Sequence, residues 1–136
     1  AINFYCSIFK NARIGHNSRN ESGNLFTGTF FLHGQEFMVL NGGPMFKFTE
    51  AISFVIDCKN QEEVDYYWEK LTSGGGQESM CGWLKDKYGL SWQVVPTVLN
   101  KLMADKDATK AKRVMQAMLQ MKKIDIGGLE KAYAEK

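Results

Sequence analysis

Cys81-Gly-Trp-Leu-Lys-Asp-Lys-Tyr-Gly-Leu-Ser-Trp-Gln-Val-Val-Pro96 is the stretch that decides the fold. Both of its ends are rich in aromatic and β-branched residues, which suit a pleated and half-buried surface. Residues 86–89 between them have the composition of a tight turn, with Gly89 where a positive φ is expected. The stretch therefore predicts a β-hairpin whose second strand ends at Pro96, because proline has no amide hydrogen to donate to a sheet.

The second strand of this hairpin has two unlike faces. Side chains alternate along a strand, so Ser91, Gln93 and Val95 share one face while Trp92 and Val94 lie on the other. We interpret the face with the hydroxyl and the amide as the wall of a cavity. Small-ligand sites combine apolar walls with a few convergent polar groups, which is the composition of this face.

Composition limits the possible functions. The chain has 136 residues, of which 44% are hydrophobic and 24% charged, as in an ordinary soluble globular protein. A net charge of +2 without an arginine-rich run argues against nucleic-acid binding, and no apolar run could span a membrane. Three widely spaced cysteines, Cys6, Cys58 and Cys81, favour a reduced, cytoplasmic setting over a disulfide framework.

The chain before Pro96 predicts a duplication. In residues 1–44, an aromatic helix precedes strands that end in a hairpin over 30–40. In residues 45–96, an apolar strand over 51–58, expected to be buried on both faces, precedes a helix capped by Asn60 and Glu63 and then the Cys81 hairpin. We expect an α+β fold of paired βαβββ modules, roughly sixty residues per copy. The first module would be complete with one strand upstream of Ala1.

Residues 97–136 predict a C-terminal helical extension. Thr97, Asp107 and Asp125 are placed as N-caps of three helices, the second running to about Lys123. Ile124 and Leu129 are placed as a hydrophobic staple at the start of the third helix.

Few side chains point to catalysis. Neither His16 nor His33 has a second histidine at metal-ligand spacing, and Cys81 has no histidine nearby in sequence to activate it. Residues 74–76 are three glycines, but they follow a helix and lack the lysine of a phosphate-binding loop. No cofactor motif is present, so we expect no cofactor.

Several segments resemble one protein family. These are the Cys81 hairpin, Asn41-Gly-Gly-Pro44 with Phe46-Lys47-Phe48, Phe54-Val-Ile-Asp57, and Val114-Met-Gln-Ala-Met-Leu-Gln-Met-Lys122. Together they resemble the PhnB-like branch of the vicinal oxygen chelate superfamily, over essentially the whole chain. This branch is often labelled 3-demethylubiquinone-9 3-methyltransferase. The resemblance implies the glyoxalase/bleomycin-resistance/dioxygenase fold, a U-shaped cavity and a homodimer.

The resemblance also identifies positions where metal-using relatives carry His or Glu. Gln93 stands at the last of these positions, Ser53 at the third, and Val39 or a neighbour at the second; the first would lie upstream of Ala1. Neutral amide, hydroxyl and aliphatic groups cannot hold a divalent cation at useful affinity, so we expect no metal site. The sequence contains no methyl-donor motif that would support the methyltransferase label.

Three functional hypotheses follow from these observations. The first is a metal-free protein that binds a small molecule through Ser53, Val55, Cys81, Ser91 and Gln93, with Trp83 or Phe30 as the apolar wall. The second is an enzyme, either a metal-dependent lyase or dioxygenase with unexpected ligands or the methyltransferase of the label. The third is a dimeric interaction protein that binds through its helical extension.

Overall fold

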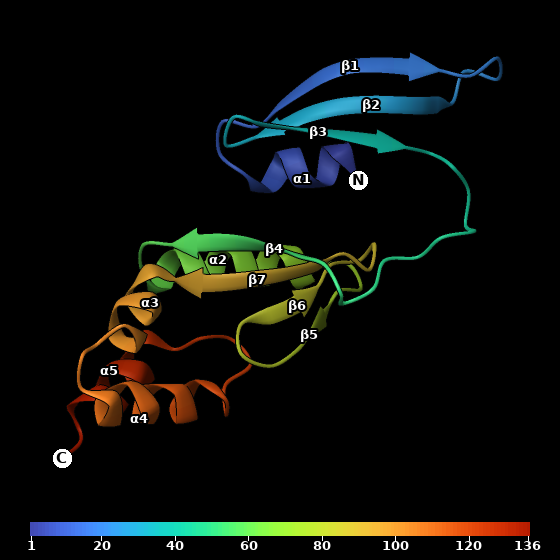
Figure 1. The fold of residues 1–136 in the computed structure, drawn as a ribbon. Coiled ribbons are helices and arrows are strands. Elements are labelled where there is room, and N and C mark those ends of the chain that lie inside the picture. The colour runs from blue at the N-terminus through green and yellow to red at the C-terminus, as the bar shows by residue number, and fades with distance from the viewer. The chain divides into compact units, whose positions relative to one another are not determined.

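The computed structural model describes residues 1–136 and divides them into two compact units, Ala1–Lys47 and Phe48–Lys136. The first unit consists of helix α1 (Ile2–Ile8) and strands β1 (Arg13–Arg19), β2 (Leu25–Leu32) and β3 (Gln35–Leu40). The strands form an antiparallel sheet in the order β1-β2-β3, and α1 lies across one face of it (Figure 1).

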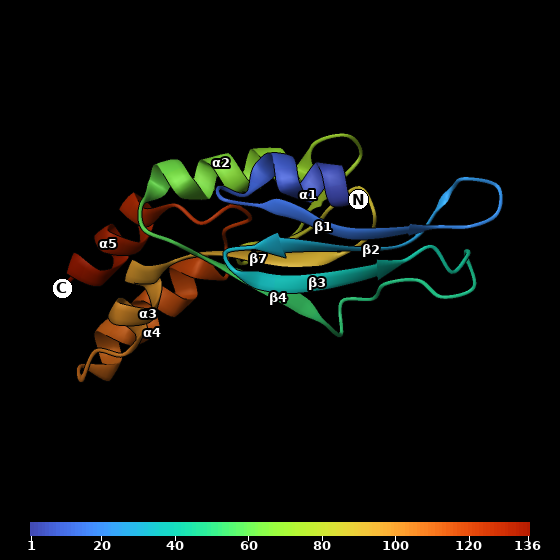
Figure 2. The ribbon, with the colours of Figure 1, turned by 90° about the horizontal axis from the view of Figure 1, so that it is seen from above.

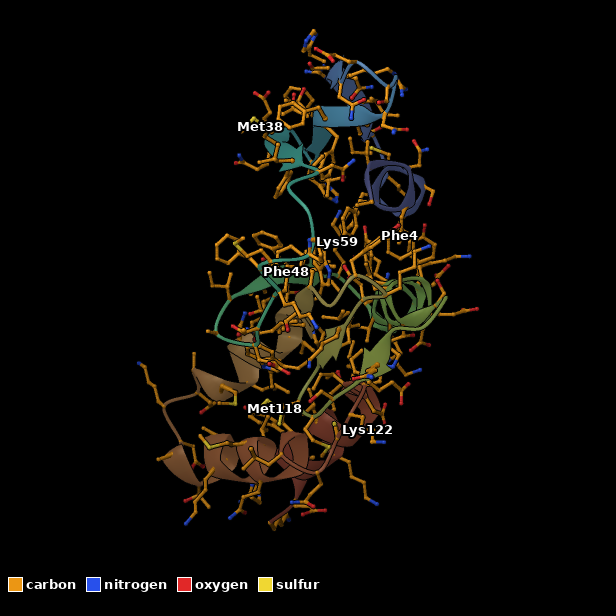
Figure 3. The ribbon with its side chains drawn as sticks, turned by 90° about the vertical axis from the view of Figure 1, so that its right-hand side faces the viewer. Phe4, Met38, Phe48, Lys59, Met118 and Lys122 are labelled. Atoms are coloured by element: carbon orange, nitrogen blue, oxygen red, sulfur yellow. The ribbon has the colours of Figure 1, made fainter.

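The core of the first unit lies between α1 and this sheet. Tyr5 of α1 stacks on Phe30 of β2 with 6.0 Å between ring centroids, and both side chains are buried. Gly28 permits this approach, because a Cβ there would lie 2.6 Å from Cδ1 of Ile2. Met38 lies on the other face of the sheet, 75% exposed, and points away from α1 (Figure 3).

The second unit contains a mixed four-stranded sheet. Its elements are β4 (Ser53–Cys58), α2 (Gln61–Thr72), β5 (Gln77–Glu78), β6 (Trp83–Lys85) and β7 (Ser91–Pro96). The strand order is β4-β7-β6-β5, with β4 and β7 parallel and the other pairs antiparallel. The predicted hairpin is confirmed as β6 and β7, and β7 ends at Pro96 as expected.

The hairpin turn is organised by one buried carboxylate. Asp86 is 3% exposed and accepts hydrogen bonds from the amides of Tyr88 and Leu90 and from the indole nitrogen of Trp92. Gly89 has the positive φ that the turn requires, +85°. The composition of the turn predicted its shape, but it gave no sign that Asp86 would be buried at its centre.

Helix α2 covers one face of the sheet. Asn60 caps it by accepting a hydrogen bond from the Glu63 amide, while the Glu63 carboxylate accepts one from the Lys59 amide. The predicted capping by Asn60 and Glu63 is therefore confirmed. The Glu63 carboxylate accepts from the amide of Lys59, one residue before the N-cap. The prediction that strand 51–58 is buried on both faces is wrong, because Val55 is 56% exposed on the face opposite its buried neighbour Ile56.

The C-terminal helical part is present, as predicted. It consists of α3 (Thr97–Met103), α4 (Ala108–Met118) and α5 (Ile126–Ala134), which gather at the end of β7 (Figure 2). Asp107 and Asp125 cap α4 and α5 through their side chains. The predicted cap at Thr97 is wrong, since Pro96 precedes the helix and no side chain caps it; α4 also ends before Lys123.

These three helices are fastened to the rest of the second unit by backbone hydrogen bonds and a shared core. The amides of Cys81 and Gly82 donate to the carbonyls of Met121 and Lys122, at 2.7 and 2.8 Å. Their shared core is a cluster of fully or almost fully buried side chains: Leu99, Val114, Ile124 and Leu129. None of the helices in the structure has the length and apolar character needed to cross a bilayer.

Candidate functional site

The site is built on the sheet face of the second unit that α2 leaves uncovered, which we call the open face. Strand pairing arranges its side chains in rows across β4, β7 and β6. One row contains Ser53, Ser91 and Lys85, and the next contains Val55, Gln93 and Trp83. A third row begins with Asp57 beside Val95. The open face therefore mixes apolar and polar groups, as the alternation in β7 predicted.

A cavity of about 330 Å³ lies on this face. This volume is at the lower end of the range typical of small-molecule sites. Its walls come from the sheet, the segment before β6, and the helices α3 and α4: Val55, Asp57, Cys81, Trp83, Gln93, Val95, Leu99, Asn100, Met103 and Met118.

Four of the six predicted ligand-binding residues line this cavity, namely Val55, Cys81, Trp83 and Gln93. Ser53 and Ser91 lie in the neighbouring row, outside the cavity lining. Phe30, the alternative apolar wall, is 3% exposed in the core of the first unit and does not line it.

Gln93 and Ser53 are joined directly. The side-chain amide of Gln93 donates to the Ser53 hydroxyl, with 2.9 Å between Nε2 and Oγ. This bond fixes the orientation of the half-buried amide at the edge of the cavity. The amide oxygen has no protein partner and can accept a hydrogen bond from a ligand.

Ser91 has an unusual position for a polar side chain. It is 1% exposed, and its hydroxyl has no hydrogen-bond partner. Beside it in the same row, Lys85 forms an ion pair with Glu50, and the hydrogen bond from Lys85 lowers the pKa of the Glu50 carboxyl. A buried hydroxyl without a hydrogen-bond partner lowers the stability of the fold. Ser91 lies in the polar row next to the row that lines the cavity.

The helical extension supplies a wall of the cavity that sequence reasoning did not assign. Leu99, Asn100 and Met103 come from α3, and Met118 comes from α4. Figure 3 shows Met118 directed from α4 toward the sheet of the same unit. No sequence signal indicated that these helices close onto the open face.

The cavity carries one formal charge. Asp57 is the only acidic or basic side chain in its lining, and neither ion pair in the structure includes it. Cys81 contributes a thiol from a backbone with φ +59°, in a region that glycine prefers. Cys58 is on the covered side of β4, where burial raises its pKa to about 12.

The residues at the expected metal-ligand positions do not fit a divalent cation. Ser53 and Gln93 are neutral and bonded to each other. Val39 faces α1 and lines a cavity of about 240 Å³ in the first unit. Its neighbours on the other face of that sheet, Met38 and Leu40, have no oxygen or nitrogen donor in their side chains. No three His, Cys, Asp or Glu side chains come together. We therefore derive no chemistry through a metal ion at these positions.

Comparison with known proteins gives a consistent family and fold. The model of the family described as 3-demethylubiquinone-9 3-methyltransferase matches residues 1–95. A putative 3-demethylubiquinone-9 3-methyltransferase, PhnB protein, from Bacillus cereus is similar at 35% identity and a TM-score of 0.65, over 71% of this chain and 88% of that one. A comparison with curated proteins finds no match.

Two more distant structures share the fold. Protein PA1353 from Pseudomonas aeruginosa has 12% identity and a TM-score of 0.56, over 69% of this chain and 84% of that one. A variant of the fosfomycin resistance protein FosX from Listeria monocytogenes, complexed with Mn(II) and 1S,2S-dihydroxypropylphosphonic acid, has 17% identity and a TM-score of 0.52, over 68% of this chain and 79% of that one. The family match ends before α3, so the resemblance predicted for the tail lies outside the matched residues.

Proposed function

Because the chain belongs to the 3-demethylubiquinone-9 3-methyltransferase family, within the vicinal oxygen chelate superfamily, we propose that it is a PhnB-like protein that binds a small organic molecule without a divalent metal ion. The ligand occupies the cavity on the open face of the second unit. The observation that carries this proposal is the hydrogen bond between Gln93 and Ser53 at the edge of that cavity.

The cavity has the composition of a binding site. Most of its walls are apolar, which favours a ligand that leaves water, and Gln93 and Asn100 provide amides that can orient it. Ser53 contributes from the neighbouring row by holding the Gln93 amide. Ser91 lies in that row too, with a buried hydroxyl that lacks a partner.

We further propose that the protein acts in the cytoplasm as a homodimer. The three cysteines are free thiols, in keeping with a reducing compartment. Residues 45–52 carry four apolar side chains that are at least 61% exposed, Met45, Phe46, Phe48 and Ile52. Large apolar side chains that are exposed in this way are typical of surfaces that another subunit covers.

A transferase is the second candidate function, and the description of the family is the observation that favours it. A methyltransferase must bind a methyl donor such as S-adenosylmethionine. Calorimetric titration of the protein with S-adenosylmethionine, with and without Mn²⁺, separates this candidate from the first. Saturable binding of the donor supports the transferase.

The proposal is tested by metal analysis followed by a ligand screen. Protein purified without chelator should contain far less than one equivalent of Mn, Fe, Ni or Zn. A fragment library screened by thermal shift in EDTA should contain compounds that raise the melting temperature, because they bind only the folded state. A stoichiometric metal ion, or fragment binding that EDTA abolishes, would sink the proposal.

A further inference from the structure

We propose that the ligand is a small organic cation, an ammonium group on an apolar body, which Asp57 recognises at one end of the cavity. This inference rests on the proposed function, since it names the chemical class of the molecule that the same cavity binds. It follows from the charge, the unpaired state and the surroundings of Asp57.

Asp57 is placed to meet a ligand. It lies on β4 beside Val95, in the last row of the open face before α3 begins. Its carboxylate belongs to neither ion pair of the structure, which are Lys85 with Glu50 and Lys123 with Asp65. A carboxylate at a cavity wall without a cationic partner favours a positively charged guest.

No basic side chain opposes this preference. The other lining residues are apolar side chains, two amides and the Cys81 thiol, with no lysine, arginine or histidine among them. An anionic ligand would therefore meet the Asp57 charge without compensation. The protein as a whole has a net charge of +2, so the negative character is local to the cavity.

The remaining walls suit the apolar body of such a cation. Trp83 presents an aromatic side chain from β6, and Met103 and Met118 present polarisable thioethers from the helices. An aromatic ring attracts an alkylammonium group, and flexible thioethers pack against the apolar carbons attached to it. The Asn100 amide, which has no side-chain partner in the structure, can accept a second ammonium hydrogen bond.

Three probes of one shape and different charge test this inference: 2-phenylethylamine, 2-phenylethanol and phenylacetate. Each is titrated into ¹⁵N-labelled full chain, and affinity is taken from shifts of the backbone and indole signals of the cavity residues. Because Asp57 is exposed, water weakens its attraction for a cation, and the amine should bind about threefold more tightly than the alcohol. Phenylacetate should bind more weakly than either.

Variants locate the origin of the preference. Asp57→Asn should bind the amine and the alcohol equally, while Glu62→Gln, which removes the same charge from an exposed position on α2, should leave the preference unchanged. Equal or tighter binding of the alcohol or phenylacetate by the natural chain overturns the inference but leaves the proposed function standing. Failure of all three probes to shift cavity signals also overturns it, and the fragment screen in EDTA then decides the proposed function separately.

Discussion

The Gln93 side chain on β7 donates a hydrogen bond to the Ser53 hydroxyl on β4, with 2.9 Å between Nε2 and Oγ. Parallel pairing places Ser53 beside Ser91, one row away from Gln93, so the bond crosses the sheet diagonally. It joins two of the positions where metal-using relatives carry ligands, as the family resemblance implies. In this chain they form a neutral, hydrogen-bonded pair at the edge of a cavity.

Replacing Gln93 with leucine should separate binding from folding. Gln93→Leu keeps the size of the side chain but removes the amide, so fragments that depend on it should no longer raise the melting temperature. The free energy of unfolding should change by less than about 1 kcal/mol, because one partly exposed hydrogen bond is lost. Gln116→Leu, at an exposed position on α4, is the matched control and should retain the fragment response.

Asp86 should be far more important for stability than its place in a turn suggests. Asp86→Ala leaves the amides of Tyr88 and Leu90 and the indole of Trp92 without their acceptor. We expect a loss of about 3 kcal/mol in the free energy of unfolding, measured by urea denaturation. A loss below about 1 kcal/mol would show that the carboxylate does not organise the hairpin.

Gln61, at the start of α2, should hold the helical extension to the rest of the second unit. Its side chain accepts from the Ile126 amide at 2.8 Å and donates to the Ile124 carbonyl at 3.0 Å. Gln61→Leu should cost about 1–2 kcal/mol, since both backbone groups are partly buried. Relative to the natural chain, the variant should show a larger increase in amide hydrogen exchange in α5 than in α2. An equal increase in both helices would contradict this role of Gln61.

Cys58 and Cys81 should differ in the reactivity of their thiols. Burial, with smaller contributions from Glu63 and Asp57, raises the pKa of Cys58 to about 12. At pH 8 the Cys58 thiol is ionised in only about one molecule in ten thousand, so iodoacetamide should label Cys58 only after unfolding. Cys81, in the cavity wall, should be labelled in the native protein and be protected by bound fragments. Rapid native labelling of Cys58 would contradict this order, which mass spectrometry can read.

Much of the fold could be predicted from local sequence signals. Strand 25–32, the hairpin turn ending at Gly89 and the caps at Asn60, Asp107 and Asp125 are each set by residues close together in the chain. Alternation in β7 placed Ser91 and Gln93 on a face opposite Trp92, and the structure has the same arrangement.

The site depends on contacts that no local pattern encodes. The cavity walls Leu99, Asn100, Met103 and Met118 meet the open face only because the tail folds back, through the bonds of Cys81 and Gly82 to Met121 and Lys122. Ser91 and Gln93 share a face, yet only Gln93 lines the cavity, because the helices cover one end of that face. Periodicity gives the face of a strand, whereas the position along that face is decided by tertiary contacts.

The indole N–H of Trp83 gives the most direct test of metal-free binding. The other two indoles are engaged, Trp68 with Glu78 and Trp92 with Asp86, whereas Trp83 lines the cavity. Fragments found by thermal shift are titrated into ¹⁵N-labelled protein in excess EDTA while the three indole signals are followed. We predict a saturable shift of the Trp83 signal with the other two nearly unchanged; a Trp83 signal that moves only after Mn²⁺, Ni²⁺ or Zn²⁺ replaces the EDTA would contradict the account.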